Sequence, residues 1–321
     1  MPSHLFLFAS ILVVSLVFAT VPLADALSLN TNEQSGRVYW KGLGDSFRHP
    51  LDFQLATAFK ASPLHEVSSG AVRKALGIVE EGLRLQLLSS SIKVSDEQLP
   101  TIQGLMVEAC KILALPEPEV YIQSSSTANA YTLATITKDK DGVSKKPIVV
   151  LTSALLELCS DAELQAIIGH ELGHLKCEHS LYLTLGSAAS TVFPFLSSKK
   201  LTQDWRLSAE YSCDRAALLV CQDVNVVNAA MVKLYAGAAI PDLNTDSFAA
   251  QSDAYEELLK DANPLIRNSI RREPRTHPLP VKRVKALKEW SDSDSYDRLV
   301  QRAKQLDQFL DSKPPTTEID S

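Results

Sequence analysis

The chain has little that would cross-link it or mark it for life outside the cell. Its five cysteines are odd in number, lack paired spacing and lie inside apolar helical patterns; they are Cys110, Cys159, Cys177, Cys213 and Cys221. We therefore expect buried thiols and not a disulfide framework. The sequence also contains no Asn-x-Ser/Thr glycosylation acceptor. Both absences argue against a mature life in the secretory lumen.

An excess of positive charge is lacking as well, because 38 acidic residues outnumber 32 lysines and arginines. The formal net charge is -6, and no basic patch is interleaved with aromatic residues. Nothing in this pattern would attract a polyanion, so we expect no nucleic-acid partner. What the chain does have is length and apolar content: 321 residues, of which 45% are hydrophobic and 22% charged. That composition supports one large or two modest domains with a real core and excludes an intrinsically disordered chain.

The first 26 residues differ from the rest. Residues 5–21 carry no charge, and Ala24-Asp25-Ala26 is a small-residue site of the kind that signal peptidases cut. We expect a signal peptide over residues 1–26, with Leu27 beginning the mature chain. The alternative is a membrane anchor that is never removed, because only the terminal amine and His4 supply positive charge before the apolar run.

Hydrophobic periodicity divides the remaining chain into three parts. Residues 27–60 contain glycines and a proline without a sustained period, so we expect a loop-rich, extended arm. Residues 61–300 form the expected domain, and residues 301–321 a polar, disordered tail. Within the domain, helices are predicted in residues 72–87, 99–112, 228–239 and 281–290, strands in residues 120–122, 131–137 and 148–151, and a hairpin connection at residues 138–142.

One segment of the domain carries chemistry: His170-Glu171-Leu172-Gly173-His174. The residues before it form a capping box and a helical apolar pattern, so the two histidines share one helix face. At about 1.5 Å rise per residue they sit roughly 6 Å apart along the axis, close enough to bind one tetrahedral metal ion. Glu171 can then reach a metal-bound water as general base. The alternative is a chance pair of histidines on an ordinary helix.

A second predicted helix carries two acids one turn apart, Glu210 and Asp214. This pairing supplies a carboxylate ligand and a partner that can hold a ligand histidine in the right tautomer. Glu178 and His179 are the other candidates for third ligand. Glu178 lies about 12 Å along the helix axis from His170, and His179 is rotated off the shared face. We therefore predict Glu210 as the third ligand and expect zinc to stay bound when Glu178 or His179 is replaced.

Four blocks of the sequence resemble a known family: Asn129-Ala130-Tyr131, the His170 to His174 helix, Glu210 with Asp214, and Thr276-His277-Pro278 followed by Arg283. In this order they are similar to the zinc metallopeptidases that include the bacterial HtpX heat-shock protease and the eukaryotic CAAX prenyl proteases. The resemblance implies a gluzincin domain of α+β fold, mostly helical, with a small β-sheet beside the active-site helix and one Zn²⁺ per chain.

The resemblance also implies roles for residues away from the metal helix. Asn129, Ala130, Tyr131 and Arg283 would bind substrate, and His277 would stabilise the tetrahedral oxyanion. The alternative for His277 is a structural hydrogen bond to the second helix. The chain departs from the family pattern in a longer loop at residues 138–146 and in the lack of a glycine soon after the Asn-Ala-Tyr block.

Residues 47–52 and 174–179 look more particularly like the cyanobacterial and plant-plastid branch of this family, which lacks several clear membrane spans. The branch implies a plastid enzyme, for which the signal peptide is the first step of a longer route; an extracytoplasmic location is the alternative. Leu181 to Ser198 is uncharged and at the lower limit of what could span a bilayer. Because polar and helix-breaking residues interrupt it, core packing is favoured over peripheral membrane contact.

Together these patterns predict hydrolysis of peptide bonds in protein substrates by zinc-activated water, in protein quality control or turnover. Glu171 takes the proton and passes it to the leaving amine. A membrane- or lipid-body-associated scaffold or chaperone-like protein with a little-used metal site is the alternative. The presence of every metal and base residue favours the enzyme. The sequence predicts no particular oligomeric state.

Overall fold

The computed structural model describes residues 44–61, 71–133, 146–180, 199–272 and 277–311. Most of these residues are helical, and a small mixed sheet completes the fold, as expected for an α+β metallopeptidase. The helices are α2 (Pro50–Lys60), α4 (Ala71–Ser90), α5 (Pro100–Leu113), α6 (Ser153–Leu158), α7 (Asp161–Lys176), α9 (Lys199–Cys221), α10 (Val224–Ala236), α11 (Thr245–Asp261), α12 (Pro264–Arg272), α13 (Pro280–Ser291) and α14 (Asp294–Asp311). The strands are β1 (Ile92–Lys93), β2 (Glu119–Gln123), β3 (Ala130–Leu133) and β4 (Ile148–Thr152).

The described sheet has the strand order β1-β2-β4-β3. The central pair, β2 and β4, runs parallel with Tyr121 opposite Val150, and every residue of β4 is buried. A continuous apolar run such as Ile148 to Leu151 is typical of a strand covered on both faces. The outer strands β1 and β3 pair antiparallel with β2 and β4, respectively. The three predicted strands are confirmed where they are described, and β1 was missed.

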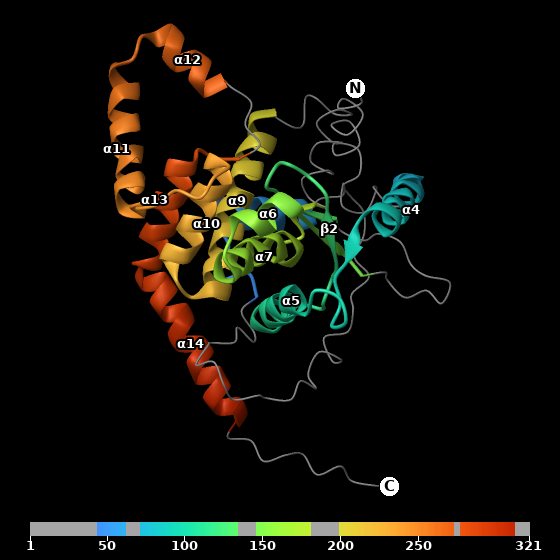
Figure 1. Cartoon of the computed structure of the whole chain (residues 1–321). Helices are drawn as coiled ribbons and strands as arrows, with labels where there is room; N and C mark the ends of the chain where they lie inside the picture. The colour runs from blue at the N-terminus through green and yellow to red at the C-terminus, as the bar shows by residue number, and fades with distance from the viewer. Residues whose placement is uncertain (1–43, 62–70, 134–145, 181–198, 273–276, 312–321) are drawn as a thin grey trace.

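Helix α7 lies at the centre of the molecule. It contacts α5, α9, α10 and β3. In Figure 1 the sheet and α4 lie on one side of α7, and α10, α13 and α14 on the other. Its start is fixed as predicted, because the Ser160 hydroxyl accepts from the Glu163 amide and the Glu163 carboxylate accepts from the Ser160 amide. Lys233 of α10 adds an ion pair to Glu163, with 2.8 Å between Nζ and Oε2.

Two glycines allow α7 to pack unusually close to α9. A Cβ atom added at Gly173 would lie 2.9 Å from Cβ of Ala216 and 3.0 Å from Cα of Cys213. At Gly169 it would lie 3.0 Å from Cα of Ala217. These separations are shorter than the roughly 3.5–4.0 Å of an ordinary carbon contact. Each glycine is adjacent in sequence to a histidine of the metal motif. The two helices are therefore closest where His170 and His174 of α7 face Glu210 and Asp214 of α9.

The predicted extended arm is wrong for its last part. Residues Pro50–Lys60 form α2, which begins with a proline in its first turn, has Asp52 there as well, and ends with Lys60. These are favourable positions for each residue type. Helix α2 packs against α9 and buries only Asp52 and Ala56. So short a buried face gives no sustained apolar period, which explains the error.

The predicted polar tail is wrong in the same way for residues 301–311, which belong to α14. That helix is largely polar and anchors itself through a few residues such as Ala303. The signal peptide, the hairpin connection at residues 138–142 and the segment Leu181 to Ser198 lie outside the described residues. Within the described part of the chain, none of the helices combines the length and apolar character needed to cross a membrane.

Candidate metal centre

The two histidines of α7 face a carboxylate of α9. Nε2 of His170 is 3.5 Å from Oε2 of Glu210, and Nε2 of His174 is 3.6 Å from Oε1 of the same carboxylate. Ligand atoms that share one tetrahedral ion, each at about 2.0–2.1 Å from it, lie roughly 3.3–3.5 Å from one another. Each histidine therefore lies at about ligand spacing from the Glu210 carboxylate, although the two histidines face different oxygens of it.

The burial and charge of the Glu210 carboxylate also support a metal site. The residue is 4% exposed, and its Oε2 accepts no hydrogen bond among the described residues. Burial alone would raise the pKa of Glu210, but His170, His174 and Arg283 together hold it well below its usual range. A buried, charged carboxylate oxygen without a hydrogen bond is costly unless cations lie close to it; Arg283 is one, with Nη1 3.7 Å from Oε2, and a metal ion between the carboxylate and the histidines would be another. Two imidazoles and one carboxylate are a donor set that suits zinc.

Asp214 holds His170 in position. Its Oδ1 lies 3.0 Å from Nδ1 of His170, and the buried carboxylate also accepts two hydrogen bonds from Arg283. A proton on Nδ1, inferred from this partner, leaves Nε2 facing Glu210. Burial opposes charge on His170, but Asp214 and Glu210 outweigh it and raise its pKa to about 9 in the metal-free protein. A metal ion would compete with that second proton for Nε2.

His174 differs from His170 in having no direct carboxylate on its far nitrogen. Burial lowers the pKa of His174 to about 3, and the neighbouring imidazoles act in the same direction against the attraction of Glu210. The imidazole is therefore neutral near pH 7, the form that binds a metal ion.

Glu171 lies on the adjoining side of α7 and is held by the sheet. The Thr132 hydroxyl on β3 donates to Oε2 of Glu171 at 2.7 Å. Burial raises the pKa of Glu171, although the charge of His170 and the Thr132 hydrogen bond act against that shift. A carboxylate with a raised pKa is a better proton acceptor near neutral pH. Sequence reasoning missed Thr132, since only the packing of β3 against α7 shows which of its faces meets Glu171.

A cavity of about 610 Å³ opens over these residues. Asn129 and Ala130 line it, as do His170, Glu171, Asp214, His277 and Arg283. His277 stands at the mouth, with 57% of its side chain exposed and its Nε2 3.5 Å from Oε2 of Glu210. The structure thus brings most of the expected site residues to one cavity.

Two of the residues expected to bind substrate are placed differently. The Tyr131 side chain faces the other side of the sheet, where its hydroxyl donates to Gln123 at 3.0 Å and its ring packs beside Tyr121. Arg283 lines the cavity but uses its guanidinium on Asp214. A direct substrate contact by either side chain has no support in this geometry.

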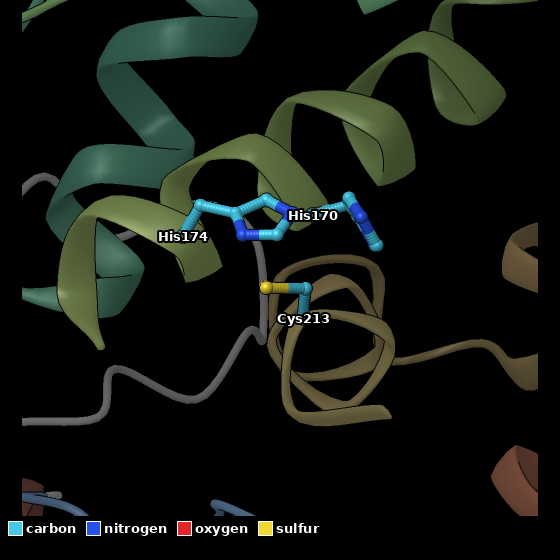
Figure 2. A group of neighbouring side chains, drawn as sticks. All are labelled: His170, His174 and Cys213. Atoms are coloured by element: carbon cyan, nitrogen blue, oxygen red, sulfur yellow. The ribbon is translucent and has the colours of Figure 1, made fainter. Parts of the chain in front are cut away.

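Cys213 lies close to the histidine pair, and single ligand atoms of His170, His174 and Cys213 lie within 4.8 Å of one another. Figure 2 shows it reaching from α9 toward the ring of His174. Its sulfur is 3.4 Å from Nδ1 of His179, which itself is 3.2 Å from Nδ1 of His174. The thiol therefore lies on the Nδ1 side of His174, away from the nitrogen that faces Glu210. Burial raises the pKa of Cys213 well above its usual value, which favours the neutral thiol.

Comparison with known proteins identifies metallopeptidases among the proteins similar to this chain. Residues 97–291 match the model described as peptidase family M48. "Plastoglobule-localized metallopeptidase 48, chloroplastic" from Arabidopsis thaliana is 39% identical over 274 residues, covering 81% of this chain and 76% of that protein. "Protease HtpX homolog" from Tropheryma whipplei is 26% identical over 230 residues, covering 63% of this chain and 77% of that protein. The crystal structure of S. mikatae Ste24p matches with a TM-score of 0.35 and 14% identity, covering 74% of this chain and 62% of that one.

Proposed function

The chain belongs to peptidase family M48, and from this premise we propose that it is a zinc-dependent metalloendopeptidase whose His170, His174 and Glu210 hold the ion. The observation that carries the proposal is the Glu210 carboxylate, which is buried, lacks a hydrogen bond on Oε2 and faces the Nε2 atoms of both histidines. The family is metal-dependent, and this donor set favours zinc over magnesium or calcium, which prefer all-oxygen sites.

Glu171 is the proposed general base. When bound, the ion supplies a Lewis acid that acidifies a water molecule and polarises the scissile carbonyl. Glu171 removes the proton from that water and returns it to the leaving amine. Thr132 keeps the Glu171 carboxylate turned toward the cavity, because its hydroxyl donates to Oε2. His277 at the mouth is positioned to donate a hydrogen bond to the developing oxyanion.

The substrate is a protein segment in extended form. Strand β3 is an edge of the described sheet and lies directly beside α7. An edge strand can bind a peptide through main-chain hydrogen bonds, which hold a substrate without reading every side chain. Asn129 and Ala130, at the start of β3, line the cavity and would place the bound segment over Glu171. Such binding suits a peptidase that acts in protein quality control or turnover.

We further propose that the enzyme works in a plastid. The support is its likeness to a chloroplastic protein whose name places it at plastoglobules. Residues 1–26 are the proposed targeting segment and are removed before the enzyme acts. The proposed catalytic unit extends beyond residues 61–300 at both ends, because α2 packs against α9 and α14, which continues to Asp311, packs against α13.

The test is degradation of casein by the purified protein before and after removal of metal with a chelator. We expect activity that is lost with the metal and restored by one equivalent of zinc. Glu171→Gln should keep zinc and lose activity by orders of magnitude, because the amide cannot accept the proton. Glu178→Gln is the matched control, since this acid lies just past α7 and pairs with Lys60. Intact zinc binding with no degradation by the wild type would instead support the scaffold.

A further inference from the structure

A third buried histidine touches the metal centre. His179 follows α7 and is 1% exposed. Glu178 before it has left-handed backbone geometry, with φ of 59°, and this turn brings His179 back to His174. The two rings are 5.2 Å apart and steeply inclined, and their Nδ1 atoms are 3.2 Å apart. Two ring nitrogens at that distance share one hydrogen, so one donates and the other accepts.

Asp52 of α2 decides which one donates. Its Oδ2 is 3.0 Å from Nε2 of His179. Asp52 also accepts two hydrogen bonds from Arg48 at 2.9 Å, one from Trp205 at 3.0 Å and one from Ser212 at 2.7 Å. A fully buried group surrounded by donors is an acceptor on every side and hence a carboxylate. The hydrogen of His179 therefore lies on Nε2, facing Asp52.

This arrangement fixes the tautomer of His174. With its Nε2 donating, His179 offers a lone pair on Nδ1, which accepts the Nδ1 hydrogen of His174 at 3.2 Å; the Cys213 thiol beside it, at 3.4 Å, is a weaker donor. His174 is then left with an unprotonated Nε2, on the side where Glu210 lies 3.6 Å away. The opposite arrangement would turn a lone pair of His179 toward the Asp52 carboxylate at 3.0 Å, which is repulsive.

The two histidines of α7 thus have matching support. His170 donates directly to a buried carboxylate paired with an arginine, Asp214 with Arg283. His174 reaches a second carboxylate–arginine pair through one intervening imidazole. Partners of this kind fix the tautomer and ring orientation of metal-binding histidines, and their loss typically weakens metal binding about 10- to 100-fold.

A second metal ion is the competing explanation for the same cluster. Single ligand atoms of Asp52, Cys177 and His179 lie within 4.8 Å of one another. Both oxygens of Asp52, however, already accept from Arg48 and from further donors. A metal ion bound to Asp52 would have to displace the guanidinium of Arg48, which already serves as the cation for this carboxylate. The geometry is that of a completed hydrogen-bond network.

We propose that Asp52 and His179 are positioning residues of the metal centre, which hold His174 in its metal-binding tautomer and orientation. The inference rests on the proposed function, because it assumes that His174 is a ligand. It extends the centre to α2, which lies outside residues 97–291 matched by the family model. Residues 47–52, which resemble one branch of the family, would then support His174 through Arg48 and Asp52.

The decisive experiment compares two replacements of His179 in the full chain. A glutamine can accept from His174 and donate to Asp52, whereas a phenylalanine fills similar space and can do neither. We expect His179→Phe to weaken zinc binding about 10- to 100-fold in competition with a chelator, and His179→Gln to stay within a few-fold of wild type. Both should bind one ion at saturation, because His179 is not a ligand. Wild-type affinity in His179→Phe, or equal losses in both variants, would overturn the proposal.

Trp205→Phe supplies the matched control. It removes one hydrogen bond to Asp52 but leaves the connection from Asp52 through His179 to His174 intact. Its metal-free protein should melt at a lower temperature, while its zinc affinity stays near wild type. A loss of affinity as large as that of His179→Phe would show that any damage around Asp52 weakens the site, and the proposal would fail.

Nitrogen NMR of the wild type keeps the test independent of variant folding. In metal-free protein with ¹⁵N-labelled histidine, His179 should carry its hydrogen on Nε2 and His174 on Nδ1. A hydrogen on Nδ1 of His179 would refute the inference. Failure of the proposed function has a different signature, because a wild type that binds no zinc would leave these tautomer signals unchanged.

Discussion

Replacing Gly173 by alanine tests the close packing on which the metal centre depends. The added Cβ would lie 2.9 Å from Cβ of Ala216, and 3.0 and 3.3 Å from Cα and Cβ of Cys213. Ordinary carbon contacts are about 3.5–4.0 Å, so α7 and α9 would have to separate by roughly 0.5–1 Å. The atoms that must move include backbone of α9, which cannot rotate away as a flexible side chain could.

The expected change in stability is the difference between two effects. Overpacking of this kind costs about 1–3 kcal/mol. Alanine, however, is about 0.5–1 kcal/mol more favourable than glycine inside a helix. The net loss in the free energy of unfolding is therefore about 0–2.5 kcal/mol, which lowers the melting temperature by up to roughly 10 °C for a domain of this size.

The effect on the metal should exceed the effect on stability. His170 and His174 belong to α7 and Glu210 to α9, so separating the helices lengthens the 3.5 and 3.6 Å spacings between their donor atoms. Metal–ligand distances tolerate only about 0.2 Å, and we expect zinc affinity to fall by about tenfold or more. Calorimetry of the metal-free protein measures the packing, and competition with a chelator measures the affinity.

Gly104→Ala is the matched control. Gly104 lies inside α5, and an added Cβ there meets nothing within 4 Å. This variant should gain about 0.5–1 kcal/mol from the helix preference alone and keep its zinc affinity. If Gly173→Ala were as stable as Gly104→Ala and bound zinc as tightly as the wild type, the argument from helix packing would be wrong.

Three further predictions concern individual side chains. Glu210→Ala should lower zinc occupancy and abolish hydrolysis, whereas Glu178→Ala should retain bound zinc; metal analysis of the purified proteins checks both, and the reverse pattern would refute the ligand assignment. Thr132→Val removes the 2.7 Å hydrogen bond to Glu171 and should lower kcat for a peptide substrate about 10- to 150-fold at unchanged zinc affinity, since a hydrogen bond to a charged group is worth about 1.5–3 kcal/mol. Cys110, Cys177 and Cys213 are free and buried, and burial raises their pKa values, so a thiol reagent at pH 8 should leave them unmodified in the native protein and label them in urea.

The sequence predicted those parts of the fold whose signals are local. The capping box and the apolar period predict helix α7, and a continuous run of aliphatic residues predicts β4. The spacing of the histidines and of Glu210 and Asp214 was likewise enough to expect four side chains on two facing helices, which the structure brings together.

Other parts depend on contacts that no local pattern encodes. Alternation along β3 shows that Tyr131 and Thr132 face opposite sides of the sheet, but only the packing against α7 determines which one meets Glu171. Helix α2 buries a single charged residue and one alanine, so its importance lies in partners far along the chain. His179 was weighed only as a ligand, and its contact with Asp52 could not be foreseen from spacing.

The connection of α2 to α9 also bears on when the protein becomes competent during synthesis. Asp52 is among the first described residues to leave the ribosome, yet Trp205 and Ser212, which donate to it, lie 153 and 160 residues further along the chain. Contacts of such long sequence separation form late, because a large loop must close before they contribute. The proposed base, Glu171, is thus made well before the helix that completes its metal site. With the proposed ligands, the metal site of a nascent chain is incomplete until α9 has been made, and the proposed support of His174 forms only when α2 has docked on α9.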